Sequence, residues 1–140
     1  MAEYKLPLPT ITDANRPFWD SARRGQLAMQ RCTRCGHIRF PINPVCTECL
    51  SDAAEWMPLS GRGEVFAKLV YHRAFNPAFG DLIPYNVVMV QLEEGPRMFS
   101  NVVGTPHDQF KVGDPVEVVF EAATDEVAIP RFKIRGRTTA

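Results

Sequence analysis

The sequence lacks a charge excess, a long apolar run and a secretion signal. Its 140 residues contain 16 Lys and Arg against 16 Asp and Glu, so the formal net charge is zero. A neutral chain has no overall field that attracts nucleic acid. No segment approaches the roughly 18 apolar residues of a membrane span, and the N-terminus lacks the apolar core of a signal peptide. We therefore expect a cytoplasmic protein that neither spans a membrane nor binds nucleic acid.

Known catalytic patterns are missing as well. The sequence has no serine in a G-x-S-x-G turn, no glycine-rich phosphate loop and no H-E-x-x-H. The three histidines, His37, His72 and His107, lie in no recognisable catalytic context. An isolated imidazole is by itself no evidence of catalysis, and a structural role is the usual one. The residues alone therefore give little reason to expect an enzyme.

Cysteine is scarce, but its four residues lie close together as two C-x-x-C pairs: Cys32, Cys35, Cys46 and Cys49. In a reducing cytoplasm, paired cysteines indicate metal ligands or redox groups before disulfides. Two such pairs on facing turns supply the four thiolates that zinc binds in a tetrahedron. The spacing therefore predicts a structural zinc site.

Other uses of these cysteines are weaker. A redox C-x-x-C accompanies a βαβ unit, which this sequence does not contain, whereas iron in a four-thiolate site is chemically possible. With four thiolates bound, no ligand position remains for water or substrate, so we expect the metal to hold the fold. Gly36 follows the first pair, where a positive φ lets amides turn toward the sulfurs. The second pair, C-T-E-C, has no glycine there.

The 12 prolines favour short strands and turns over long helices. We expect an extended arm over residues 1–14, then a helix from Asn15 to Arg24 with Asn15 as its cap and Gly25 as its stop. The predicted strands cover residues 27–31, 37–41, 55–59, 64–72, 84–94, 97–103, 116–121 and 127–135. The chain is thus predicted to be mostly β.

The turn S-G-R-G-E at 60–64 is the clearest break in the chain. It divides a helix and cysteine-containing region, 15–60, from an all-β region, 61–140. Five strands in the second region suit a small closed barrel of the OB type. The strand 84–94 is apolar on both faces and is therefore expected at the centre of the sheet, whereas Pro130 predicts an edge position for the last strand.

Arginine is concentrated at one end of the chain. Residues 16–39 contain a single acid, Asp20, and six arginines, which are Arg16, Arg23, Arg24, Arg31, Arg34 and Arg39. They form either a solvated face or a basic patch for a phosphate-bearing ligand or an acidic partner.

The loop from Arg73 to Pro84 contains four large apolar residues in a stretch too broken for a strand: Phe75, Phe79, Leu82 and Ile83. These side chains either fold back on the barrel or form an exposed patch. An exposed patch of this kind marks a docking or ligand site.

Several stretches, in this order, resemble the acyl-CoA-associated zinc-ribbon OB-fold proteins, which were long catalogued as a domain of unknown function. They are PFWDSARRGQLAMQRCTRCGHIRFPINPVCTEC, SGRGEVFAKLVYHR, PYNVVMVQLEEGPRMFSNVVG, KVGDPVEVVFE and IPRF. The resemblance runs from about Pro17 to Phe132. It implies an N-terminal helix and a rubredoxin-like zinc ribbon, followed by a five-stranded OB-fold barrel.

The resemblance also implies a function. Relatives are small non-catalytic subunits of thiolase-like enzymes, including thiolases, acyltransferases and aldolases, and they stabilise the complex or complete its acyl-CoA site. The four cysteines carry over as zinc ligands, and no catalytic residue does. A thiolase-like catalytic subunit is the implied partner in a hetero-oligomer, and a coenzyme A thioester is a further candidate ligand. Arg23, Arg24, Phe75 and Phe79 are the candidate surface for either.

Two other classes remain as alternatives. Zinc ribbons and OB barrels also bind nucleic acid, but strands 84–92 and 116–121 carry no basic stripe, which a groove for single strands needs beside its aromatic residues. A free-standing acyl-CoA carrier differs from a subunit in being stable and monodisperse alone.

Overall fold

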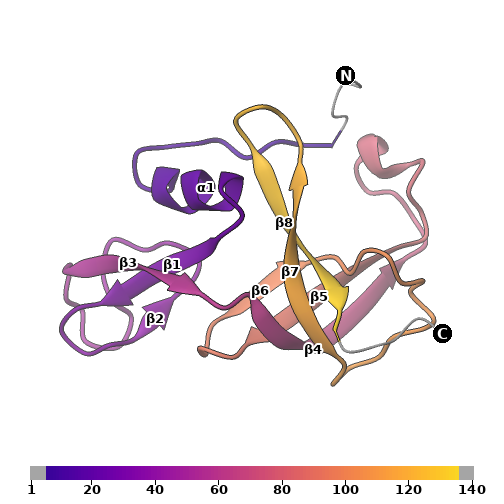
Figure 1. The fold of residues 1–140 in the computed structure, drawn as a ribbon. Coiled ribbons are helices and arrows are strands. Elements are labelled where there is room, and N and C mark those ends of the chain that lie inside the picture. Colours follow the sequence, from indigo (N-terminus) through magenta and orange to yellow (C-terminus); the bar gives the residue numbers. More distant parts are fainter. Residues whose placement is uncertain (1–5, 136–140) are drawn as a thin grey trace.

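The computed structural model describes residues 6–135 and confirms the mostly β fold (Figure 1). The ends of the predicted arm and of the predicted barrel region, residues 1–5 and 136–140, lie outside the described residues. The helix α1 (Arg16–Arg23) precedes an antiparallel sheet with strand order β2-β1-β3. We call this sheet and its cysteine turns the ribbon; its strands are β1 (Leu27–Cys32), β2 (Ile38–Arg39) and β3 (Ala54–Leu59).

The second sheet has five antiparallel strands in the order β6-β5-β4-β7-β8, and we call it the barrel. Its strands are β4 (Arg62–Tyr71), β5 (Tyr85–Leu92), β6 (Arg97–Ser100), β7 (Pro115–Ala122) and β8 (Ala128–Ile134). A short 3₁₀ helix that the sequence did not predict, η1 (Pro77–Phe79), lies in the β4–β5 loop. As expected, β5 lies inside the sheet and β8 lies at an edge.

The barrel sheet curls into the half-barrel of an OB fold. A register shift between Val65 and Ala67 marks a bulge in β4, and bulges bend and twist a strand. The chain after β6 then meets the opposite edge, because the Val103 amide donates to the Phe132 carbonyl at 2.8 Å and the Phe132 amide donates to the Asn101 carbonyl at 3.0 Å. These bonds join the two ends of the curled sheet.

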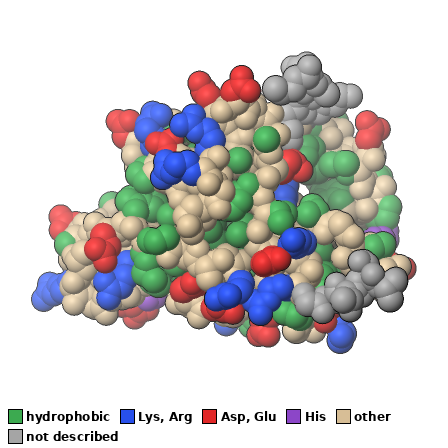
Figure 2. Space-filling view, in the orientation of Figure 1, with side chains coloured by type: hydrophobic (Ala, Val, Ile, Leu, Met, Phe, Trp, Pro, Cys, Tyr) green, Lys and Arg blue, Asp and Glu red, His purple; other side chains and the backbone are tan. Residues whose placement is uncertain are grey.

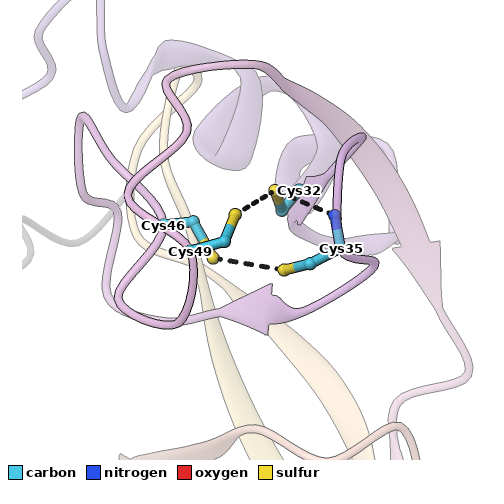
Figure 3. Close-up of side chains that lie close together, drawn as sticks. All are labelled: Cys32, Cys35, Cys46 and Cys49. Atoms are coloured by element: carbon cyan, nitrogen blue, oxygen red, sulfur yellow. Dashed lines mark hydrogen bonds between the residues drawn. The ribbon is translucent and has the colours of Figure 1, made fainter.

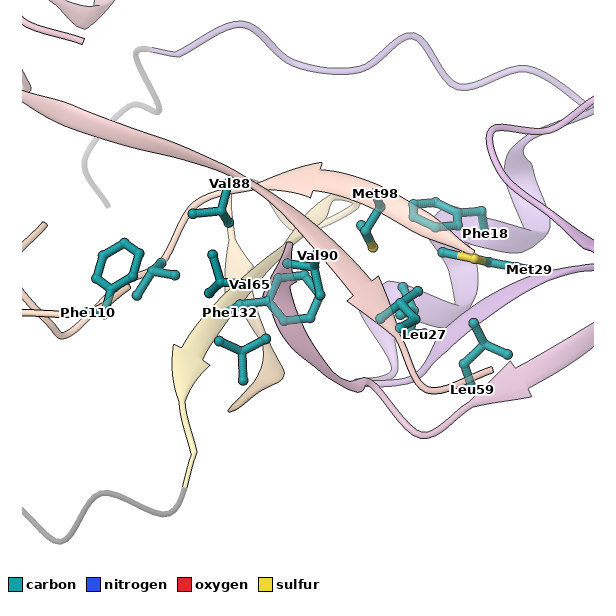
Figure 4. Packing of buried hydrophobic residues seen from close by; sticks show 13 residues of the cluster. Phe18, Leu27, Met29, Leu59, Val65, Val88, Val90, Met98, Phe110 and Phe132 are labelled. Atoms are coloured by element: carbon teal, nitrogen blue, oxygen red, sulfur yellow. The ribbon is translucent and has the colours of Figure 1, made fainter. Parts of the chain in front are cut away.

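One continuous hydrophobic cluster runs from the ribbon into the barrel (Figure 4). The helix and the ribbon contribute Phe18, Leu27, Met29 and Leu59, and the barrel contributes Val65, Val88, Val90, Leu92, Met98, Val102, Phe110, Val116 and Phe132. The α1 helix packs on β1 and also contacts β7 and β8, so it lies against both parts. The ribbon and the barrel therefore share a core.

The start of α1 differs from expectation in one detail. Asn15 occupies the cap position, but its side chain makes no capping hydrogen bond. Its Oδ1 instead accepts from the Thr12 amide at 2.7 Å, and its Nδ2 donates to the Thr10 carbonyl at 3.0 Å. The side chain therefore holds the preceding arm rather than the free amides of the helix.

Candidate metal centre and docking surface

The four cysteines lie on two tight turns that face each other at the end of the ribbon (Figure 3). All four Sγ atoms lie within 4.8 Å of one another, with 3.6 Å between Cys32 and Cys49 and 3.5 Å between Cys35 and Cys46. A tetrahedral site with metal–sulfur bonds of about 2.3 Å has sulfur–sulfur edges of about 3.8 Å. The donor set therefore fits one metal ion held by four thiolates.

The two cysteine turns share one backbone pattern. The Gly36 amide donates to the Cys32 carbonyl at 2.9 Å, and the Leu50 amide donates to the Cys46 carbonyl at the same distance. Leu50 therefore occupies the place of Gly36, and its φ of 65° is close to the 83° of the glycine. The sequence did not predict this equivalence, because residues other than glycine rarely adopt the left-handed conformation and Leu50 gave no sign of it.

Proton affinities differ within the sulfur cluster. The Cys35 amide donates to Cys32 Sγ at 3.4 Å, and this bond is the main cause that lowers the Cys32 pKa to about 6. The His37 amide lowers the pKa of Cys35, but desolvation and the neighbouring sulfurs together raise it to about 12. The thiols thus compete with one another for ionisation, and a cation bound among them would favour loss of the last proton.

The arginines of residues 16–39 do not form one patch. Arg16 and Arg31 form ion pairs with Asp13 and Glu55, and Arg39 is buried in the ribbon. Arg23 and Arg24 are exposed at the end of α1, the helix over which Lys and Arg side chains gather in Figure 2. Arg34 is exposed on the first cysteine turn. The six residues therefore have different environments, although they are grouped in the sequence.

The apolar residues of the β4–β5 loop are mostly exposed. Phe75 is 76% exposed, and Leu82 and Ile83 are 47% and 38% exposed. Phe79 is half-buried because its ring stacks on Tyr85, with 5.1 Å between the ring centroids. The loop therefore presents a surface patch. Phe75 is the more exposed ring and meets Tyr71 only edge to face, with 6.0 Å between the ring centroids, whereas Phe79 is stacked on the barrel.

Sequence reasoning missed a second apolar surface beside this loop, which we call the outer apolar face. It consists of Phe66, Leu69, Val87, Met89 and Phe99 on neighbouring strands β4, β5 and β6. Leu69 and Phe99 are 55% and 66% exposed. The signal was present, since strand 84–94 is apolar on both faces. We used that pattern to predict a central position in the sheet, which is correct, and did not infer an exposed apolar face from it.

A cleft of about 400 Å³ lies where the loop approaches residues 101–107. Apolar side chains including Phe79 and Leu82 line it, together with the polar side chains of Asn86, Asn101 and Arg131. An apolar cleft with a few polar groups is the usual form of a small-molecule site.

The predicted surface residues are not brought together. The η1 loop, with Phe75 and Phe79, lies on one side of β7 and β8, and α1, with Arg23 and Arg24, lies on the other (Figure 1). They are therefore two separate surfaces.

Two family models match the chain consecutively. Residues 19–55 match the rubredoxin-like zinc ribbon domain of ChsH2, and residues 56–121 match the C-terminal OB-fold domain of ChsH2. Within residues 6–135, no helix has the length and apolarity needed to cross a membrane.

Curated relatives include both long and short proteins. The chain is 34% identical to a probable enoyl-CoA hydratase alpha subunit of Thermomonospora curvata, over 91% of this chain and 39% of that protein. It is 32% identical to a DUF35 domain-containing scaffold protein of Methanothermobacter thermautotrophicus, over 91% of this chain and 99% of that protein. It is 30% identical to the benzoylsuccinyl-CoA thiolase subunit BbsA of Thauera aromatica, over 75% and 72%. This chain therefore spans well under half of the hydratase subunit.

Among solved structures, a chain of the "Ltp2-ChsH2(DUF35) aldolase" superposes with a TM-score of 0.80 and 33% sequence identity. The match covers 91% of this chain and 98% of that chain. The consecutive domain matches and this agreement in sequence and fold together show the family. The chain belongs to the DUF35 family of ChsH2-type proteins, in which a rubredoxin-like zinc ribbon precedes an OB-fold domain.

Proposed function

We propose that this chain is a zinc-binding, non-catalytic accessory subunit of a thiolase-like enzyme that acts on acyl-CoA substrates. The catalytic residues belong to a larger subunit, which is a thiolase, an acyltransferase or an aldolase. The two chains form a hetero-oligomer, in which this chain stabilises the complex or completes the acyl-CoA site. The four cysteines bind zinc, and the zinc holds the ribbon in shape.

The observation that carries this proposal is the continuous apolar side of the barrel. Phe75, Leu82 and Ile83 are exposed on the loop, and Phe99 is exposed on the neighbouring outer apolar face. Soluble monomers rarely leave large contiguous apolar patches uncovered, and aromatic anchors are typical of protein interfaces. We assign this side to the catalytic subunit.

The names of the relatives support the choice of partner. Two are named as subunits of an enoyl-CoA hydratase and of a benzoylsuccinyl-CoA thiolase, and the structural relative is titled an aldolase. The shared element is a subunit of a larger enzyme rather than one reaction. We therefore place the reaction on the partner and the supporting role on this chain.

The acyl-CoA substrate has two candidate contacts on this chain. The cleft lined by Phe79 and Leu82 lies beside the proposed interface, where it would receive part of a substrate bound to the partner. Arg23 and Arg24, on the other side of the barrel, supply positive charge for the phosphates of coenzyme A or for a second contact with the complex.

The outer apolar face suits a protein partner better than a nucleic-acid strand. Lys68 is engaged, since its Nζ donates to the His107 and Phe110 carbonyls. The Arg97 guanidinium lies 3.8 Å from the ring centroid of Phe66. Single-strand binding needs a groove of positive charge along the backbone, and these two cations are already occupied within the protein.

The test compares Phe75→Ala with Phe79→Ala in complexes with a candidate thiolase-like catalytic subunit. Phe75→Ala should weaken partner affinity by about 2 kcal/mol, the size of an interface hot spot, and should leave the melting temperature almost unchanged. Phe79→Ala should lower both, because it also removes the ring stacked on Tyr85. Isothermal titration and thermal unfolding measure the two quantities.

Val112→Ala is the control, because Val112 is 57% exposed but belongs to neither the loop nor the outer apolar face. It should change neither the affinity nor the melting temperature. If the Phe75 variant lost stability in proportion to affinity, the loop would be part of the hydrophobic core and not an interface. Full affinity in the Phe75 variant would remove the loop from the interface.

A further inference from the structure

A groove of about 650 Å³ separates the ribbon from the β5–β6 hairpin. Residues 36–41, 43 and 47 of the ribbon line one wall, and residues 91 and 94–97 line the other. None of the four cysteines lines the groove, and it shares no lining residue with the cleft beside the η1 loop. It is therefore a separate feature from the metal centre and from that cleft, although Arg97 of its far wall borders the outer apolar face by stacking on Phe66.

Arg39 lines this groove and is only 4% exposed. Its Nε donates to Gln30 Oε1 at 3.2 Å and to the Asn43 carbonyl at 2.9 Å. The same Gln30 oxygen accepts from the Asn43 amide at 3.1 Å, which locks the three groups together. The guanidinium is thus held in place by one of its nitrogens, while Nη1 is buried with no hydrogen-bond partner in residues 6–135.

The charge of Arg39 is also unpaired. Among residues 6–135, no ion pair involves Arg39 at a nitrogen–oxygen distance of 4.0 Å or less. Glu94, the acid on the opposite wall, accepts from the Ser60 amide at 2.8 Å instead. A buried cation without a counter-charge is costly, and proteins seldom retain one unless an anion compensates it.

We propose that this groove is an anion site, in which Arg39 binds a carboxylate or phosphate group of a small molecule. A water molecule in the groove satisfies an N–H group but does not neutralise the charge. An anionic oxygen does both, and its hydrogen bond to a guanidinium is strengthened where water is excluded. Because Nη1 is buried, its surroundings have to shift slightly to admit the oxygen. The exposed turn at Gly95 forms part of the far wall, so its amide reports on a molecule bound in the groove.

The site does not depend on the proposed function. It rests on the burial, the bonding and the unpaired charge of Arg39, and it holds for an accessory subunit or for any other role. Carboxylate and phosphate share the required chemistry, which is two or more oxygen atoms that carry negative charge. Separate titrations with each anion distinguish them.

The experiment titrates the metal-loaded chain with sodium phosphate and, separately, with sodium malonate at constant ionic strength. Nitrogen-15 NMR follows two signals, that of the Arg39 Nε–H group and that of the Gly95 amide. At least one anion should shift both signals in a saturable way, and the tighter-binding anion identifies the ligand class. Absence of saturable shifts with both anions overturns the proposal.

Two pairs of variants distinguish specific anion binding by Arg39 from non-specific attraction to the positive charges of the surface. Arg39→Gln should weaken anion binding by about tenfold or more, the usual effect of losing a charged hydrogen bond. Arg34→Gln should not, since Arg34 is exposed and does not line the groove. Equal losses in the two variants would mean non-specific attraction and would overturn the proposal.

The second pair of variants tests the same site without altering the buried arginine, so it applies even if Arg39→Gln fails to fold. Glu94→Gln removes the negative charge from the groove wall and should raise anion affinity severalfold, because the acid repels the ligand. Glu126→Gln, at the exposed β7–β8 turn, should leave the affinity unchanged. Identical anion affinities for these two variants overturn the proposal.

Discussion

The ribbon and the barrel share a core but contribute to it very unequally. Most of the buried cluster belongs to the barrel, whereas the helix and the ribbon add Phe18, Leu27, Met29 and Leu59. Leu27 pairs with Leu59 at the end of the ribbon sheet near the barrel, and Cys32 pairs with Ala54 at the other end. The cysteines lie at the end that the hydrophobic core does not reach, where the metal that we propose would stabilise the ribbon. Small domains that cannot bury enough apolar surface commonly rely on a metal in this way.

The largest effect is expected from Cys46→Ser, which removes one of the four sulfur donors of the ribbon and leaves the barrel core unchanged. Cys46 is fully buried and is one of four donors, so its loss should release the metal. The ribbon amides should then exchange rapidly with solvent, while β4, β5 and β7 stay protected by their own core. Elemental analysis and hydrogen exchange measure the two effects.

Thr47→Ser is the control for this variant, because it alters the same turn but keeps all four thiols. It should retain about one zinc per chain, the stoichiometry of a four-cysteine site. Loss of protection in the ribbon and the barrel together in the Cys46 variant would show that they unfold as one unit, contrary to this prediction.

A change in the barrel core should have the next largest effect. Phe132 is fully buried, and removing a ring from such a site costs about 3–5 kcal/mol of unfolding free energy. Phe132→Ala should therefore destabilise the barrel by that amount in denaturant unfolding. Phe99→Ala, a matched change at a ring that is 66% exposed, should change stability by about 0.5 kcal/mol or less. Similar losses at the two positions would contradict the assigned core.

The smallest effect distinguishes the two cysteine turns. Leu50 is 75% exposed and has a positive φ, so Leu50→Gly should relieve strain and stabilise the ribbon by about 1 kcal/mol. Gly36→Ala should destabilise it by a similar amount, because alanine is strained at a φ of 83°. Thermal unfolding of the metal-loaded chain measures both. Changes of the same sign in the two variants would disprove the equivalence of the turns.

Local pattern was sufficient to predict α1 and the strands and to single out the four cysteines that the fold brings together, but it did not predict η1. The helix expected over 15–24 spans Arg16–Arg23, and the strand expected over 84–94 spans Tyr85–Leu92. Alternation of apolar residues and turn-forming glycine and proline act over a few residues, so they are visible in the chain itself. The C-x-x-C pairs are equally local, since each turn is built within its own few residues.

The tertiary structure decided the features that depend on what lies opposite a residue. It placed Leu50 in a glycine position, exposed the second face of β5 and separated Phe75 from Phe79 in burial. It also buried Arg39 beside a hairpin that lies far along the chain, whereas the sequence showed only one more arginine in a basic stretch. Burial, pairing and exposure arise from contacts between distant segments. The sequence by itself therefore determined α1, the strands and the two cysteine pairs, and only the fold determined which surfaces remain open.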